Sequence, residues 1–95
     1  MKIYISGKIT GTTDYMERFA VVEKRLTEKG FSVINPARVN ACMPLDTTYE
    51  QYMEMCFCML KQADAIYLMH GWRNSNGACR EYSFAQAEKK IIMEE

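Results

Sequence analysis

The chain has 95 residues, 48% of them hydrophobic, so it can bury one core and is too apolar to stay disordered. Twelve Lys and Arg residues balance twelve Asp and Glu residues, and this zero formal charge argues against a nucleic-acid polymer or a charged membrane surface as the main partner. No apolar run approaches the roughly 18 residues of a membrane span, and residues 1–8 do not resemble a signal peptide. We therefore expect a single domain over residues 1–95 in the cytoplasm.

The cysteines do not form a recognisable framework. Cys42, Cys56, Cys58 and Cys79 are unevenly spaced and include no CxxC pair, and His70 is the only histidine. Without an export signal, reduced thiols are expected, and this set of residues lacks the usual spacing of zinc ligands. The sequence thus predicts no disulfide, no metal site and no cofactor.

In the first third of the chain, a strand-like segment is followed by a helical one. Residues 2–6 are β-branched and aromatic and stop at a glycine, which predicts a strand, and residues 7–13 form a loop. Asp14 opens a helix that ends near Gly30, with Glu17 as a capping-box partner. One face of this helix is expected to be buried, through Tyr15, Phe19, Val22 and Leu26.

The same alternation continues to the end of the chain. Residues 31–35 predict a second strand, stopped by a proline, and residues 37–46 predict a loop. Thr47 with Glu50 indicates a capping box for a helix that ends near Gln62. The remaining expected elements are a strand at 65–70, a helix from 74–77 to about 89, and a strand at 91–93.

Strands that alternate with helices are typical of a parallel sheet covered on both faces. We predict an α/β fold, a minimal flavodoxin-like or Rossmann-like three-layer sandwich whose four-stranded sheet has the order 2-1-3-4. In such sheets a ligand binds beyond the carboxyl ends of the strands, where the winding reverses. This point lies between the first and third strands, so the loops at 7–13 and 71–77 should form a pocket.

The predicted helix at about 49–62 is unusually apolar. Its apolar side chains are Met53, Met55, Cys56, Phe57, Cys58, Met59 and Leu60. A surface helix normally keeps a polar face, so this helix is either tucked under a loop or part of a subunit interface. Because large exposed apolar patches are rare, we expect the interface, and hence a homo-oligomer.

Two loops carry candidate binding residues. Residues 6–11, Ser-Gly-Lys-Ile-Thr-Gly, could offer backbone N–H groups to a phosphate or a sugar hydroxyl, although a tight turn explains them equally well. At the start of the last predicted helix, Gly77 would let a ligand approach the backbone. Glu81 is either a carboxylate favoured by the helix dipole or a nucleophile or base at the pocket mouth, and spacing alone favours the first.

Three other side chains could take part in the same site. Trp72 either stacks on a nucleobase or caps the core. The Tyr4 hydroxyl needs a partner if it is buried, and Glu81 is a sensible one. His70 could act as an acid or base, or simply end its strand through a hydrogen bond.

Together these segments resemble the nucleoside 2-deoxyribosyltransferase-like family, in particular its short bacterial and phage members. The resemblance covers essentially the whole chain, and its matching segments are residues 2–7, residues 63–67, the Gly71-Trp72 pair and the motif Ser75-x-Gly77-x-x-x-Glu81. Enzymes of this family cleave the N-glycosidic bond of a (deoxy)nucleoside or its 5′-monophosphate. The resemblance therefore implies a small nucleoside or nucleotide as the partner.

The resemblance also assigns roles to matching positions. It implies that Glu81 attacks the anomeric carbon and holds the sugar as a glycosyl ester, as the nucleophile of a retaining glycosidase does. Tyr4 would orient Glu81. The sugar or its 5′ side would contact Gly7, Lys8 and Thr10, and the 5′-hydroxyl or phosphate would contact Ser75 and Gly77.

One position departs from the family pattern. Family enzymes carry an aspartate eight residues before the one that matches Asp64, where this chain has Cys56. That aspartate helps the base to leave, and an ordinary thiol is a poor substitute. His70 could replace it, the reaction could need no donor, or the site could bind a nucleotide without turning it over.

Three functions therefore stay open: an N-glycosidic enzyme, a nucleotide-binding module without turnover, and an interaction domain with a vestigial pocket. A Glu81 that is reachable and free of Lys and Arg would favour the enzyme, whereas an ion pair with Arg80 or Lys8 would favour binding. We also expect Glu81→Ala to keep the fold, because a partly exposed carboxylate at a helix start contributes little to stability.

Overall fold

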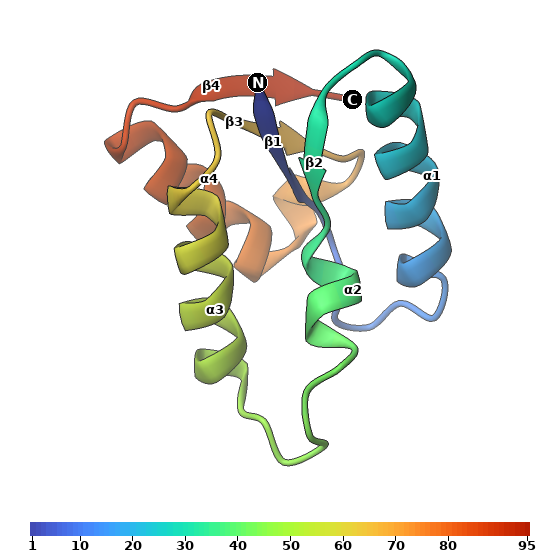
Figure 1. Ribbon diagram of the computed structural model, residues 1–95. Helices are drawn as coiled ribbons and strands as arrows, with labels where there is room; N and C mark the ends of the chain where they lie inside the picture. The colour runs from blue at the N-terminus through green and yellow to red at the C-terminus, as the bar shows by residue number, and fades with distance from the viewer.

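A four-stranded parallel sheet with the order β2-β1-β3-β4 runs through the protein (Figure 1). The computed structural model describes residues 1–95. The strands are β1 (Lys2–Ser6), β2 (Ser32–Ile34), β3 (Ala65–Leu68) and β4 (Ile91–Glu94). The helices are α1 (Tyr15–Glu28), α2 (Pro36–Asn40), α3 (Tyr49–Lys61), a short 3-10 turn at Trp72–Asn74, and α4 (Asn76–Ala87). The predicted fold and strand order are confirmed.

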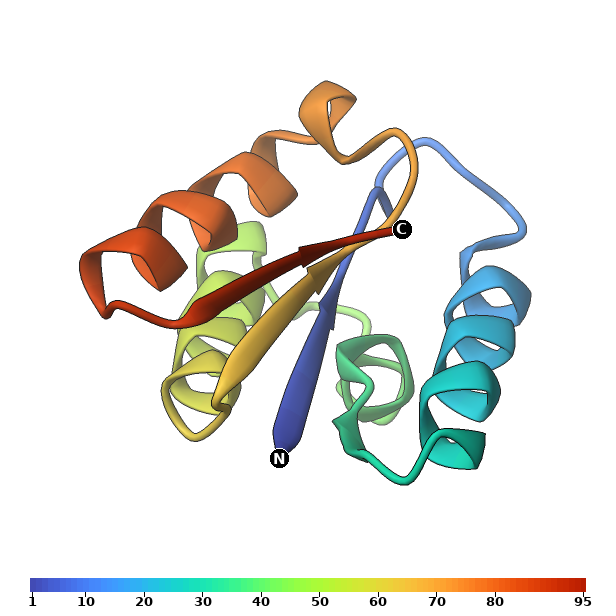
Figure 2. The same ribbon diagram turned by 90° about the horizontal axis from the view of Figure 1, so that it is seen from above.

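Helices cover both faces of the sheet, α1 and α2 on one side and α3 and α4 on the other (Figure 2). Each face has its own apolar core. Toward α1 and α2 the buried side chains are Ile3, Ile5, Phe19, Val22, Leu26, Ala37, Ala65, Tyr67 and Met69. Toward α3 and α4 they are Tyr4, Cys56, Leu60, Ala63, Ile66, Leu68, Trp72, Ala78 and Ala85.

The alternation of side chains along β1 prepares the site. Successive residues of a strand point to opposite faces, so Ile3 and Ile5 enter the core beneath α1 while Tyr4 and Ser6 face α4. In the register of the sheet, Tyr4 lies beside Ile66 of β3. Two hydroxyl groups are thereby held on a central strand whose residues from Ile3 to Ser6 are buried.

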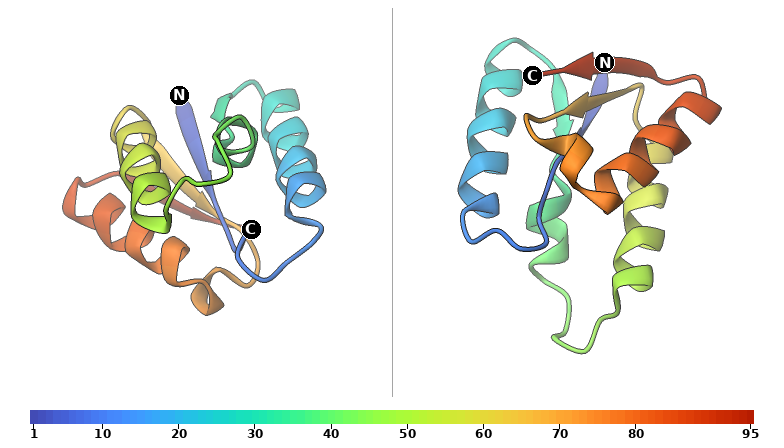
Figure 3. Two further views of the ribbon diagram at one scale, coloured as in Figure 1. Left: turned by 90° about the horizontal axis from the view of Figure 1, so that it is seen from below. Right: turned by 180° about the vertical axis from the view of Figure 1, so that it is seen from behind.

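The segment predicted as a loop at 37–46 begins with a helix. Asn35 caps α2 by accepting a hydrogen bond from the Ala37 N–H at 3.0 Å, and Pro36 occupies the first turn, where its missing N–H has no cost. The prediction of a loop over the whole segment is therefore wrong for its first part. Beyond α2, residues 41–48 extend past the carboxyl ends of the strands before α3 begins (Figure 3).

Both predicted capping boxes need correction. At α3 the box is formed one residue later than expected, by Thr48 and Gln51, whose side chains each bond the other's backbone N–H. At α1 Asp14 occupies the cap position but makes no capping bond with its side chain. Its carboxylate instead pairs with Arg18 one turn later, at 3.1 Å.

The α3 helix has more of a polar face than its sequence suggested. Met53, Cys56 and Leu60 are buried within the chain itself, while Glu54 and Lys61 are exposed. The apolar residues left half-buried on α3 are Met55, Phe57 and Met59. None of the helices in the protein is both long enough and apolar enough to cross a membrane.

Candidate active site

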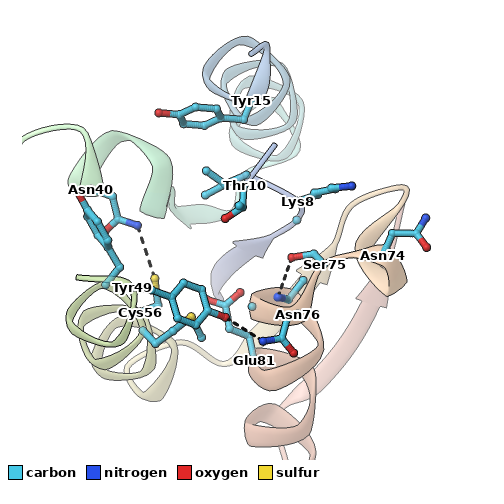
Figure 4. A pocket seen from close by; sticks show the side chains of 16 residues that line it. Lys8, Thr10, Tyr15, Asn40, Tyr49, Cys56, Asn74, Ser75, Asn76 and Glu81 are labelled. Atoms are coloured by element: carbon cyan, nitrogen blue, oxygen red, sulfur yellow. Dashed lines mark hydrogen bonds between the residues drawn. The ribbon is translucent and has the colours of Figure 1, made fainter. Parts of the chain in front are cut away.

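A cavity of about 520 Å³ lies beyond the carboxyl ends of β1 and β3, lined by residues from both predicted loops. Its walls also include the start of α1, the end of α2 and the first half of α3 (Figure 4). The cavity therefore occupies the predicted position, and three helices complete the walls that the two loops begin.

Glu81 of α4 lies in the cavity lining and is only 6% exposed. Its carboxylate is held from β1, where the Tyr4 hydroxyl donates to Oε2 and the Ser6 hydroxyl donates to Oε1 at 2.7 Å. No Lys or Arg forms an ion pair with it, since Arg80 pairs with Glu50 and Lys8 pairs with no carboxylate. The carboxylate is thus fixed by neutral donors and remains open to the cavity.

Burial decides the protonation behaviour of this cluster. Desolvation raises the pKa of Glu81 above its ordinary value, against the opposing hydrogen bonds from Tyr4, Ser6 and Cys56. Burial and the nearby Glu81 charge raise the pKa of Tyr4 well above its usual range. Tyr4 therefore stays protonated and acts as a permanent donor to the carboxylate.

Cys56 lies on α3 at the same end of the cavity. Burial, together with the Glu81 charge, raises the pKa of its thiol to about 11. The Asn40 side-chain amide donates to Cys56 Sγ at 3.7 Å, and Asn40 Oδ1 is buried without a partner. At neutral pH the Cys56 group is a thiol, which can donate to Glu81 but is a very weak acid.

Polar groups line the wall formed by the two predicted loops. Gly7, Lys8 and Thr10 contribute from the β1–α1 loop. Opposite them, Ser75 caps α4 by accepting the Ala78 N–H at 3.1 Å. Asn74, Asn76 and Gly77 complete this wall at the N-terminus of α4. Of the binding residues predicted in these two loops, Gly7, Lys8, Thr10, Ser75 and Gly77 line the cavity, and Trp72 does not.

Three tyrosines provide the aromatic part of the lining. Tyr15 comes from α1, and Tyr49 and Tyr52 come from α3. None was singled out as a site residue from the sequence. The pattern did contain a signal, because Tyr49 and Tyr52 begin a helix next to the pocket and the first turn of such a helix faces the strand ends.

Two predicted site residues lie outside the cavity. Trp72 is buried against Tyr82, and its indole N–H donates to Glu94 at 3.0 Å. Trp72 therefore caps the core, which was one of its two expected roles. The other expectation, that its ring lines the pocket and stacks on a nucleobase, is wrong. His70 is exposed, with its backbone N–H bonded to Glu95 at 2.8 Å, so its placement as an acid or base of the pocket is also wrong.

The nature of the lining limits the chemistry available. Glu81 is the only carboxylate in it, and no imidazole is present. Nowhere in the protein do three His, Cys, Asp or Glu side chains cluster as metal ligands would, and all four cysteines are free thiols. A buried carboxylate held in place by hydroxyl donors suits a nucleophile that attacks an electron-poor carbon.

The fold is that of the nucleoside 2-deoxyribosyltransferase-like proteins. The chain is similar over 99% of its length to a 2-deoxyribosyltransferase from Bacillus psychrosaccharolyticus, with a TM-score of 0.78 and 16% identity, and covers 71% of that chain. It is similar over the same share to a CMP N-glycosidase from Clostridium botulinum, with a TM-score of 0.67 and 22% identity, and covers 67% of that chain.

In sequence, the chain belongs to the family described as a domain of unknown function (DUF4406), whose model matches residues 1–94. No curated protein shows a significant match to it. The resemblance stated from the sequence is confirmed at the level of the fold.

Proposed function

We propose that the protein cleaves or transfers the N-glycosidic bond of a nucleoside or a nucleoside 5′-monophosphate, with Glu81 as the nucleophile. The observation that carries this proposal is the carboxylate of Glu81. It is buried in the cavity wall, fixed by Tyr4 and Ser6, and paired with no cation. A structural carboxylate at this depth would be expected to have a cationic partner.

The reaction would proceed in two displacements at the anomeric carbon. A Glu81 oxygen forms a bond to C1′ as the bond from C1′ to the base nitrogen breaks, and the electron pair of that bond leaves with the base. Water or a second base then attacks C1′ and releases the carboxylate. Splitting the displacement in this way lowers the barrier at an oxocarbenium-like centre.

The two ends of the cavity suit the two ends of such a substrate. Ser75, Gly77 and the N-terminal N–H groups of α4 would receive the 5′-hydroxyl or 5′-phosphate, with Lys8 on the facing loop. Tyr15, Tyr49 and Tyr52 offer apolar faces for the base. The names of the two structural neighbours, a deoxyribosyltransferase and a CMP N-glycosidase, agree with this class of substrate.

A second function is favoured by one specific observation. Cys56 stands where a second carboxylate would assist the leaving base, and its thiol is too weak an acid to replace it. A nucleotide-binding module without turnover would keep the cavity and need no such group. Its Glu81 would then contact the sugar hydroxyls only.

Base release distinguishes the two. The pure protein is incubated with ribonucleosides, deoxynucleosides and their 5′-monophosphates, and free base is followed by chromatography. We expect release from at least one compound that is lost in Glu81→Gln, whose side chain keeps the size but not the charge. Binding that raises the melting temperature, with no release from any compound, would instead establish the binding module.

We further propose that the chain self-associates through α3. Met55 and Met59 lie four residues apart on one face of α3 and are half-buried in the single chain, and a partner helix would cover them. Sedimentation velocity at micromolar concentration should give a dimer or larger species, and Met55→Glu should shift it toward monomer, with Glu54→Gln as the neighbouring control. A monomer mass for the unmodified protein would overturn this proposal.

A further inference from the structure

The cavity has a nucleophile but neither a second carboxylic acid nor an imidazole to protonate a leaving base. Carboxylic acids and imidazolium groups most often serve this purpose in enzymes. Glu81 is committed to the attack, and the lining contains no second carboxylate and no imidazole. The Tyr4 hydroxyl is hydrogen-bonded to Glu81. The Cys56 thiol also faces Glu81, and its pKa of about 11 makes it a poor proton donor.

The charges around the cavity also leave Glu81 without a positively charged partner. Glu81 is buried with no positive partner, which is costly unless the ligand supplies one. Arg80 could have supplied it, but both of its terminal nitrogens are bonded to the Glu50 carboxylate, at 3.0 and 3.2 Å. Figure 4 shows the Lys8 side chain directed away from Glu81.

The aromatic lining fits a positively charged ring. Electron-rich tyrosine faces attract cations, most strongly where solvent is excluded. Tyr49 already receives Arg80 over its ring, with 5.6 Å from the guanidinium carbon to the ring centroid, while Tyr15 and Tyr52 have no such partner. Neither of these two rings is therefore occupied by a cation of the protein itself.

From these observations we infer that the preferred substrate is an N-glycoside whose base carries a positive charge at the glycosidic bond, such as a pyridinium riboside or an N7-alkylated purine nucleoside. This inference rests on the proposed function. A cationic base needs no proton in order to leave: Glu81 bonds to C1′, the C1′–N bond breaks, and its electron pair neutralises the ring. Water then adds to C1′, Glu81 leaves as a carboxylate, and one proton passes to solvent.

The test compares substrates that differ in charge. Nicotinamide riboside and 7-methylguanosine are cationic, and guanosine is the neutral counterpart of the second. Each is measured with the protein, with Glu81→Gln and without protein, so that the intrinsic reactivity of each compound is divided out. We expect the acceleration by the protein, in kcat/KM over the uncatalysed rate, to be at least about 100-fold greater for the two cations.

Replacing Cys56 provides a second measurement. Cys56→Asp introduces the missing acid and should raise the cleavage of guanosine relative to that of nicotinamide riboside. Cys56→Ser, with a hydroxyl of similar size, should leave the ratio of the two rates as it is in the unmodified protein. The unmodified protein still decides the outcome if the aspartate variant does not fold. Equal acceleration of guanosine and 7-methylguanosine would overturn this inference and leave the proposed function standing. Absence of Glu81-dependent cleavage of every compound would overturn both.

Discussion

Glu81→Gln should reduce base release by about 10³-fold or more, because the amide cannot form the glycosyl ester. The loss should appear in kcat, since the amide keeps the size of the carboxylate and the shape of the cavity. Steady-state chromatography of free base at saturating substrate measures it. Glu88→Gln, at an exposed position just beyond α4, is the matched control and should retain full activity.

The same variant should be more stable than the unmodified protein at neutral and alkaline pH. Burial raises the pKa of Glu81 in the folded state, so folding favours the protonated carboxyl. The contribution of this group to stability is therefore fully present below its unfolded pKa and is lost as the pH rises through its folded pKa. Because the amide does not titrate, the melting temperature of Glu81→Gln should exceed that of the unmodified protein by more at pH 8 than at pH 4.

Glu81→Ala does not give the same result, and the expectation that it leaves the fold unaffected rested on a wrong premise. The carboxylate is buried rather than partly exposed, and its removal leaves the Tyr4 and Ser6 hydroxyls without an acceptor. Each buried unsatisfied group costs about 1–3 kcal/mol. A stability gain for the alanine variant, or a melting-temperature difference for the glutamine variant that does not change with pH, would contradict this account.

The sequence contained most of the fold because local and global signals agree. β-branched strands alternate with amphipathic helices, and this order leaves few arrangements of a parallel sheet. The exceptions are local. The α2 helix is short, and the rest of its segment has the composition of a turn. Asn35 followed by Pro36 is nevertheless a typical start of a helix, and the prediction missed it.

The sequence predicted the parts of the site that a motif or a strand end defines, but not the parts that depend on tertiary packing. The residues of the two loops follow from their place after β1 and β3. Glu81 was pointed to by the motif that carries the family resemblance, since spacing alone favoured a carboxylate that interacts with the helix dipole. Trp72 lies beside the same loops, but its indole turns toward Glu94 in the neighbouring strand β4. The contribution of Tyr15 required knowing how α1 lies against the strand ends, which no spacing in the sequence records.

Tyr4→Phe should move the acid side of the pH profile to higher pH. The Tyr4 hydroxyl donates to Glu81 and lowers the pKa of that carboxyl against the effect of burial. Phenylalanine keeps the ring in the core but removes the donor, so the pKa of Glu81 rises further and less of it is ionised at a given pH. Of the groups that face Glu81, only Ser6 and Cys56 then remain as donors.

A hydrogen bond to a charged group contributes about 1.5–3 kcal/mol, so kcat/KM at pH 6 should fall by roughly 10- to 100-fold. The loss of kcat/KM should shrink as the pH rises, because the fraction of Glu81 that is still protonated then ionises. Tyr82→Phe removes a hydroxyl that meets only Gln86, outside the cavity, and should leave the profile in place. A loss in Tyr4→Phe that is equal at every pH would show that the hydroxyl orients Glu81 without tuning its ionisation.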